Sequence, residues 1–582
     1  MMYIEKINSP ADIKALSVIE LTALASEIRS GLMNRLSKRG GHFGPNFGFV
    51  EATIALHYVF DSPKDKIVYD VSHQSYTHKM LTGRKNAFLF DEHFGDVSGY
   101  TNPEESQHDF FNVGHTSTAV SLACGLAKGR DLKGDRENVI AVIGDGSLSG
   151  GEALEGLDFA AELASNFIIV VNDNDMSIAE NHGGLYQNLK ALRESNGTCP
   201  CNLFKAMGLD YLYVPEGNDI AALIAAFSKV KDCDHPIVVH INTLKGKGYA
   251  PAEENKESWH WCMPFDEKTG KSRYNGSGES YDSLTCDYLL KKMKADEKVV
   301  AVVAAVPTNI GFTEDKRKEA GKQFIDVGIA EEHAVAMVSG IARNGGKPVF
   351  ATHSSFFQRT YDQISQDLCI NGNAATLLVN TASVYGMNDV THLGIFDIPM
   401  LSNIPNLVYL APTNCEEYFA MLDWSIEQDQ FPVAVRIPCN GVIHTNEPVD
   451  TDYSKLNQYQ MTQQGREIAI LALGDFYQIG EALAKLIAER TGIEPTLINP
   501  RYITGIDTEM LEALKKDHAK VITLEDGILD GGFGEKIARF YGPADMKVYN
   551  YGLKKAFIDR YSVEEILREN HLTPEQIVQD VL

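Results

Sequence analysis

The chain has 582 residues, of which 44% are hydrophobic, and this length suits about three or four domains with cores of their own. Its formal charge of −26, without a stripe rich in lysine and arginine, argues against nucleic-acid binding. No apolar run approaches the length of a membrane span, and the N-terminus has no signal-peptide or transit-peptide pattern, so we expect no membrane contact and a cytoplasmic location. Of the nine cysteines only Cys199 and Cys201 are close together, and one such pair does not indicate a zinc site.

From about Ala11 to Gly248, short apolar strands alternate with helical patterns, which predicts a parallel sheet. A polar stretch at 265–282 is the best candidate for a linker. A second α/β unit follows, and a third, smaller one begins after the acidic segment 447–456. The strands expected in the second unit are 299–305, 348–353, 375–380, 407–412 and 432–437. The prediction is an α/β fold of three domains, 1–285, 286–450 and 451–582, each with a mostly parallel sheet flanked by helices.

Two polar loops in the first domain indicate a metal-bound diphosphate. The apolar strand 138–143 runs into Gly144-Asp145-Gly146, and after a helical pattern the strand 167–171 runs into Asn172-Asp173-Asn174. In such a crossover both loops open at the same sheet edge, so Asp145 and Asn174 can converge on one cation. Mg²⁺ prefers oxygen ligands, and the glycines and the following helix N-terminus suit an anion. Gly-Asp-Gly alone also fits an ordinary turn, but the spaced second loop favours thiamine diphosphate.

Further motifs fall into one pattern. They are GGHFGPNFG (40–48), DVSHQSYTHKMLTG (70–83), GHTSTAVSLACG (114–125), KGKGYAPAE (245–253), VGIAEEHAV (327–335) and HSSFFQRTYDQ (353–363). Together they make the chain resemble the 1-deoxy-D-xylulose-5-phosphate synthase family, which is related to the transketolases, from about Gly40 to the C-terminus. The resemblance implies a transketolase-like homodimer that uses thiamine diphosphate and Mg²⁺, with its active site between the first and second domains of a chain.

The resemblance implies three catalytic residues. Glu331 matches the carboxylate that hydrogen-bonds the cofactor's aminopyrimidine, although a glutamate at a helix start also complements the helix dipole. His42 and His260 match two histidines beside the reactive carbon, where imidazole can move protons near neutral pH. A lone histidine is more often structural, but these two stand inside family motifs.

The same resemblance implies the contacts of cofactor and metal. The metal ligands are Asp145, Asn174 and the backbone carbonyl of Met176. The cofactor contacts are His73, Gly114, His115, Thr116, Gly146, Ser147, Asn174, Tyr249, Glu331 and Phe356.

The substrate positions depart from the family pattern. The family carries two arginines that grip the phosphate of the aldehyde acceptor, and Thr381 and Cys439 stand in their places. His353 replaces a tyrosine and Asn388 an aspartate, while His392 is retained. The segment after Asn174 is shortened to about 182–202. Other lysine or arginine residues, such as Arg359 or Arg436, are the alternative source of positive charge.

We therefore expect a thiamine-diphosphate transferase of the 1-deoxy-D-xylulose-5-phosphate synthase type. It would decarboxylate pyruvate or a related 2-oxo acid and pass the two-carbon unit to an aldehyde, either glyceraldehyde 3-phosphate or one without a phosphate. A transketolase-like ketol transferase and a non-catalytic paralogue that binds the cofactor remain as alternatives.

Overall fold

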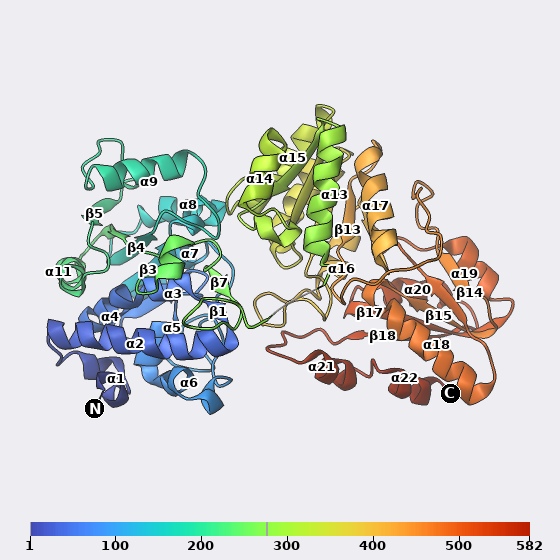
Figure 1. Cartoon of the computed structure of the whole chain (residues 1–582), viewed down its shortest axis with the longest axis horizontal. Coiled ribbons are helices and arrows are strands. Elements are labelled where there is room, and N and C mark those ends of the chain that lie inside the picture. The colour runs from blue at the N-terminus through green and yellow to red at the C-terminus, as the bar shows by residue number, and fades with distance from the viewer. Residues whose placement is uncertain (1, 275–277) are drawn as a thin grey trace. The chain divides into compact units, whose positions relative to one another are not determined.

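The computed structural model describes residues 2–274 and 278–582 and divides them into two compact units. The first comprises the described part of residues 1–277 together with Gly328–Ala330, and the second comprises Gly278–Val327 and Glu331–Leu582. Figure 1 labels their elements. In the described residues no helix combines the length and apolar character needed to cross a membrane.

The first unit is built on a five-stranded parallel sheet with the strand order β2-β3-β4-β6-β5. Its strands are β2 (Lys66–Tyr69), β3 (Val139–Gly144), β4 (Phe167–Asp173), β5 (Asp210–Val214) and β6 (Pro236–Asn242). Alternate residues of β3 face opposite sides, so Ile140 and Val142 join one apolar cluster and Ala141 and Ile143 another. Every strand but β5 was expected from the sequence.

Helices cover both faces of this sheet. On one side lie α7 (Ala119–Lys133), α8 (Gly151–Ala160) and α9 (Gly184–Glu194), and on the other α4 (Val50–Val59) and α11 (Ile220–Val230). The long helix α2 (Val18–Arg39) starts at a capping box in which Ser17 and Glu20 bond each other's backbone N–H groups. A short antiparallel ribbon of β1 (Gly41–His42) and β7 (Trp261–Cys262) stands apart from the sheet.

The second unit holds two sheets. The six-stranded parallel sheet has the order β12-β13-β11-β10-β8-β9, and the five-stranded sheet β14-β16-β15-β17-β18 is parallel except for β14. The strands of the first are β8 (Val299–Val303), β9 (Phe324–Asp326), β10 (Lys347–His353), β11 (Thr376–Asn380), β12 (Val408–Leu410) and β13 (Val433–Arg436). Those of the second are β14 (Gln460–Gln463), β15 (Glu467–Ala472), β16 (Thr496–Asn499), β17 (His518–Ile528) and β18 (Lys547–Leu553).

Helices also flank the sheets of the second unit. The main ones are α13 (Tyr281–Ala295), α15 (Glu331–Arg343), α17 (Cys415–Glu427), α18 (Tyr477–Thr491), α20 (Phe533–Tyr541) and α22 (Pro574–Val581). Three mostly parallel, helix-flanked sheets confirm the predicted α/β class. The three-domain boundaries stay a prediction, because the compact units are two and the second holds two sheets. Of the predicted linker, Phe265 is buried in the core of the first unit, and 275–277 lie outside the described residues.

Candidate active site

Asp145 and the second polar loop meet at the carboxyl edge of the first sheet, as the sequence predicts. Gly144 pairs in register with Asn172, which sets the ends of β3 and β4 side by side. Asp145 is buried, and its Oδ2 accepts the backbone N–H of Met176 at 3.0 Å and Nδ2 of Asn181 at 2.8 Å. Burial and then the neighbouring Asp173 raise the pKa of Asp145 to about 8. A bound cation would reverse that shift, because its charge favours the carboxylate.

Asn174 presents an oxygen that fits a cation ligand. Its Oδ1 is buried and has no hydrogen-bond partner among the described residues. Buried polar atoms are normally satisfied, so such an atom calls for a ligand or another explanation. No group of three histidine, cysteine or acidic side chains that could hold a metal occurs in the described ranges. The donor set at this edge is therefore one carboxylate, one amide and backbone groups, which suits Mg²⁺ rather than zinc.

The loops expected at the diphosphate pack closely together. A Cβ on Gly146 would lie 2.7 Å from Ser177 Oγ, and one on Gly150 would lie 2.1 Å from Ser117 Oγ, so only glycine fits at either position. Ser117 Oγ donates to the Ser147 carbonyl at 2.8 Å. This bond joins Ser147 to the loop that contains Gly114, His115 and Thr116 and leads into α7.

Three predicted histidines gather in one place in the first unit. The ring centroids of His42 and His73 are 5.0 Å apart, those of His73 and His260 are 5.4 Å apart, and those of His42 and His260 are 5.7 Å apart. Burial, with Lys245 as the next cause, holds the pKa of His260 well below its usual range. His260 Nδ1 is buried without a hydrogen bond to any described residue. A neutral imidazole with an open nitrogen can accept or relay a proton.

A buried asparagine fixes the backbone of two of these histidines. Asn46 Nδ2 donates to the carbonyl oxygens of His42 and His73, each at 2.7 Å, and Asn46 Oδ1 accepts the Tyr76 N–H at 2.9 Å. His42 is also held in the β1–β7 ribbon next to His260. The sequence analysis missed Asn46, although it lies in the GGHFGPNFG motif.

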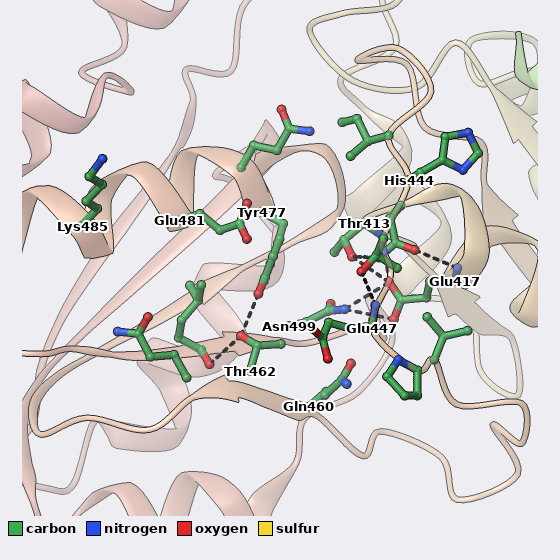
Figure 2. Close-up of a pocket in the computed structure, with 18 of the residues that line it drawn as sticks. Thr413, Glu417, His444, Glu447, Gln460, Thr462, Tyr477, Glu481, Lys485 and Asn499 are labelled. Atoms are coloured by element: carbon green, nitrogen blue, oxygen red, sulfur yellow. Dashed lines mark hydrogen bonds between the residues drawn. The ribbon is translucent and has the colours of Figure 1, made fainter. Parts of the chain in front are cut away.

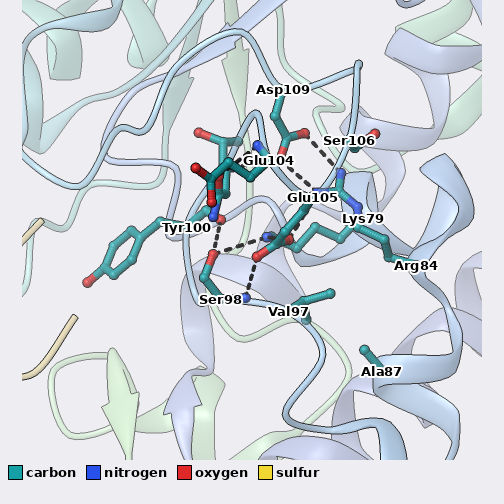
Figure 3. A network of polar contacts seen from close by, with 12 residues as sticks. Lys79, Arg84, Ala87, Val97, Ser98, Tyr100, Glu104, Glu105, Ser106 and Asp109 are labelled. Atoms are coloured by element: carbon teal, nitrogen blue, oxygen red, sulfur yellow. Dashed lines mark hydrogen bonds and ion pairs between the residues drawn. The ribbon is translucent and has the colours of Figure 1, made fainter. Parts of the chain in front are cut away.

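A buried ionic network supports the loop that passes His42. Lys79 pairs with Glu105, Arg84 bonds both Glu105 and Asp109, and the Ser98 N–H donates to Glu105, as Figure 3 shows. Ser98 Oγ bonds the carbonyl of Tyr100, whose ring centroid lies 5.8 Å from that of His42. The network therefore positions one wall of the histidine cluster.

Lys245 is a second group that the sequence analysis missed. It is fully buried, and its Nζ donates to the Ser177 carbonyl at 2.5 Å. Burial lowers the pKa of Lys245 to about 7, and Asp145 opposes the shift. An anion beside this amine would restore its charge, so Lys245 suits a diphosphate. The signal was the KGKG sequence directly after β6.

Tyr249 serves the packing of the first unit. Its hydroxyl donates to the Glu267 carbonyl at 3.1 Å, and its ring packs against Phe43 and Trp259. Its predicted contact with the cofactor stays a prediction.

In the second unit, Glu331 begins α15, as predicted. It is 3% exposed, and its Oε2 makes no hydrogen bond with a described residue. Arg359 Nη1 lies 3.6 Å from that oxygen. Burial raises the pKa of Glu331, and Arg359 opposes the rise. A buried carboxyl with a free oxygen can hydrogen-bond a ring nitrogen of a ligand.

Four of the predicted substrate and cofactor residues form one cluster in this unit. The Phe356 ring centroid lies 5.1 Å from that of His353 and 5.5 Å from that of His392. His353 Nδ1 and Thr381 Oγ1 are 2.8 Å apart, and His353 Nε2 bonds Asn309 at 2.8 Å. Thr381 thus anchors His353, in contrast to the arginine that the resemblance leads one to expect there.

The two remaining substrate positions have partners of their own. Asn388 Nδ2 donates to the Tyr561 carbonyl at 2.8 Å. The backbone N–H of Cys439 donates to the carboxylate of Asp475 at 3.0 Å. Burial and the nearby Asp526 raise the pKa of Asp475 to about 7. An acidic side chain therefore adjoins Cys439, where the resemblance leads one to expect a guanidinium.

The alternative cation Arg436 is committed elsewhere. It is buried, with Nε 2.9 Å from Asp397 Oδ2 and Nη1 2.5 Å from Asp526 Oδ1. A guanidinium bound to two buried carboxylates has little charge left for a phosphate. Arg359 has a looser contact, with Nη1 3.6 Å from Glu331 Oε2.

A cavity of about 940 Å³ in the second unit contains none of the predicted residues. Figure 2 shows its polar lining, which includes Glu417, Glu447, Glu481 and Lys485. Glu417 accepts bonds from Thr413 and from Asn499 at 3.0 and 3.1 Å, so its polar groups are satisfied within the fold. We assign no function to this cavity.

The fold and these residues define an α/β enzyme of the transketolase type. Residues 4–201 and 194–243 match the family profile of 1-deoxy-D-xylulose-5-phosphate synthase. Residues 282–441 match the transketolase pyrimidine-binding domain, and residues 457–577 match the transketolase C-terminal domain.

Full-length relatives agree with these matches. The chain is 37% identical over 599 residues to 1-deoxy-D-xylulose-5-phosphate synthase 1 of Geobacter sulfurreducens, covering 96% of this chain and 93% of that protein. It is 36% identical over 617 residues to the synthase of Pelotomaculum thermopropionicum, covering 100% and 96%. A solved Campylobacter jejuni transketolase matches 97% of this chain and 100% of its own at 16% identity, with a TM-score of 0.44. The chain belongs to the 1-deoxy-D-xylulose-5-phosphate synthase family, whose members are thiamine-diphosphate-dependent transferases.

Proposed function

We propose that this chain, with thiamine diphosphate and Mg²⁺, decarboxylates pyruvate or a close 2-oxo acid and transfers the two-carbon unit to an aldehyde. The observation that carries the proposal is the gathering of His42, His73 and His260 in the unit whose sheet edge holds Asp145 and Asn174. Membership of the family supports the donor and the cofactor.

In this proposal each group has a defined task. Asp145, Asn174 and the Met176 carbonyl hold Mg²⁺, and Lys245 offsets the charge of the diphosphate. Thiamine diphosphate, when bound, would supply the nucleophilic carbon and the electron sink that decarboxylation of a 2-oxo acid needs. Glu331 holds the aminopyrimidine, and His42 and His260 move protons at the substrate oxygen.

The proposed acceptor is an aldehyde that carries no phosphate or places it away from Thr381 and Cys439. Thr381 Oγ1 is bonded to His353, and Asp475 adjoins Cys439. A phosphate at Cys439 would meet a carboxylate, and like charges repel strongly in a partly buried site. The family's usual acceptor, glyceraldehyde 3-phosphate, is therefore expected to react poorly.

Assembly and location complete the proposal. We infer a homodimer from the family resemblance. A cytoplasmic location fits the nine cysteines, all of which are unpaired.

One assay tests the function. Purified protein with thiamine diphosphate and Mg²⁺ is given [1-¹⁴C]pyruvate and a panel of phosphorylated and neutral aldehydes, and CO₂ and ketose products are measured. CO₂ release that is stimulated by an aldehyde is the expected result. Activity only with a ketose phosphate donor, without CO₂, would establish ketol transfer instead. Cofactor binding without turnover of any donor would establish the non-catalytic paralogue.

His42→Ala and His260→Ala give the matched test of the donor site. Both are expected to lower pyruvate turnover while the affinity for thiamine diphosphate changes little. Normal decarboxylation by both variants would refute the assignment.

A further inference from the structure

Arg193 spans the turn that presents Asn174. It lies on α9, in the segment that follows the second polar loop. Its Nη1 bonds both carboxylate oxygens of Asp173, at 2.8 and 2.7 Å, and its Nη2 lies 2.5 Å from Asp175 Oδ1. One guanidinium therefore grips the residues on both sides of Asn174.

The turn itself is constrained. Asp175 has φ +62°, in the left-handed region, and its N–H bonds Asp173 Oδ1 at 3.1 Å. Asn174 Oδ1, between the two aspartates, is the buried oxygen without a hydrogen-bond partner among the described residues. Holding such an oxygen away from any partner requires a rigid support, because a mobile amide would turn to find one.

The contact with Asp175 separates two possible roles of Arg193. Asp173 has another partner, because His240 Nε2 lies 2.8 Å from its Oδ2. The Asp175 side chain is 62% exposed and has no need of a buried counter-charge. If Arg193 only balanced the charge of Asp173, it would not need to contact Asp175. The contact is needed if Arg193 fixes the turn between the two aspartates.

We infer that Arg193 is a positioning residue that aims the Asn174 amide oxygen at Mg²⁺. The inference rests on the proposed Mg²⁺-dependent binding of thiamine diphosphate and adds a determinant of metal choice. Mg²⁺ demands near-ideal octahedral geometry, whereas Ca²⁺ accepts irregular ligands. Loosening the turn is therefore expected to weaken Mg²⁺ binding more than Ca²⁺ binding.

The experiment titrates metal-free, full-length protein with Mg²⁺ or Ca²⁺ at a fixed concentration of thiamine diphosphate, and calorimetry follows binding. Arg193→Met is expected to raise the half-saturating Mg²⁺ concentration about 10- to 100-fold, the usual effect of losing a group that orients a metal ligand. The half-saturating Ca²⁺ concentration should change less. Arg193→Lys should lie between, since an amine cannot span both carboxylates as a planar fork does.

Two further variants keep the test decisive. Lys190→Met removes an exposed partner of Glu194 on the same helix and should leave both metal affinities unchanged. Asp175→Asn takes the charge out of the outer contact of Arg193 and keeps a residue that tolerates the left-handed backbone, so it should lower the Mg²⁺ affinity even if Arg193→Met fails to fold. Equal weakening of Mg²⁺ and Ca²⁺ binding, or wild-type affinities in both Arg193→Met and Asp175→Asn, would overturn the inference. Wild-type protein that binds the cofactor without any metal would overturn the proposed function, and the inference with it.

Discussion

Replacing Asn46 by leucine is expected to damage catalysis far beyond its effect on stability. Leucine has a similar volume but cannot donate to the His42 and His73 carbonyls, which Asn46 Nδ2 now bonds at 2.7 Å each. Asn46 is 1% exposed, so water cannot replace the lost donors without a rearrangement.

The size of both effects follows from these contacts. Leaving a buried polar group unsatisfied costs roughly 1–3 kcal/mol, so the two carbonyls and the Tyr76 N–H that Asn46 Oδ1 accepts amount to about 3–9 kcal/mol of folding stability. The backbone relieves part of this cost by moving, which shifts His42 relative to His73. A displacement of about 1 Å in a catalytic group can lower the rate about 100-fold.

Asn138→Leu is the matched control. Asn138 is 2% exposed in the same unit, and its Nδ2 also donates to two acceptors, Asp65 at 3.1 Å and Asp232 at 2.9 Å. It precedes β3, at the end of the strand away from Asp145. Thermal unfolding and pyruvate decarboxylation are measured for both variants. If Asn46→Leu loses no more kcat than Asn138→Leu at a comparable loss of stability, the positioning role of Asn46 is refuted.

Glu331→Gln should slow exchange of the cofactor's C2 proton for deuterium by orders of magnitude while the fold persists. If NMR shows the wild-type exchange rate in this variant, the role of Glu331 is structural. For the wild-type protein we expect a kcat/KM with glyceraldehyde 3-phosphate below about 10⁴ M⁻¹s⁻¹. The double variant Thr381→Arg with Cys439→Arg should raise this kcat/KM. If it does not, residues 381 and 439 do not face the phosphate of the acceptor. The preference for neutral over phosphorylated aldehydes should weaken as pH falls through about 7, the pKa of Asp475, because protonation removes its repulsion. Asp475→Asn should weaken that preference above pH 7, and an unchanged pH profile in the variant would remove Asp475 from the argument.

The sequence predicts most of the fold because the central strands are short runs of β-branched residues. FIIVV is buried on both faces and became β4, with its polar end at the predicted loop. Two of the strands that were missed carry weaker signals. The strand β9 has only three residues, and β14 lies at a sheet edge with exposed polar residues. Such strands form because a neighbour offers hydrogen bonds, which a single sequence does not reveal.

The arrangement of the candidate site could be predicted where a motif sets the positions of its residues, and less well where tertiary contacts set them. Spacing brought Asp145 beside the second loop, and a shared motif pattern pointed to the three histidines. The support for those groups comes from residues distant in sequence: Arg193 reaches back to Asp173, and Asn46 ties His42 to His73. Sequence spacing says nothing of such contacts, because they depend on how the elements pack.

Thr381, one of the proposed substrate positions, sits in a backbone that leaves it little freedom. Thr381 has φ +54° and Ser383 φ +99°, both unusual for residues with a side chain. A Cβ on Gly394 would lie 2.0 Å from the Thr381 carbonyl oxygen, so Gly394 allows a close approach that fixes this strained turn. Residues in such conformations cost about 1–3 kcal/mol each and persist only where the surroundings impose them. His353 Nδ1 lies 2.8 Å from Thr381 Oγ1, so the strained turn also fixes the hydrogen-bond partner of His353, another of the proposed substrate residues.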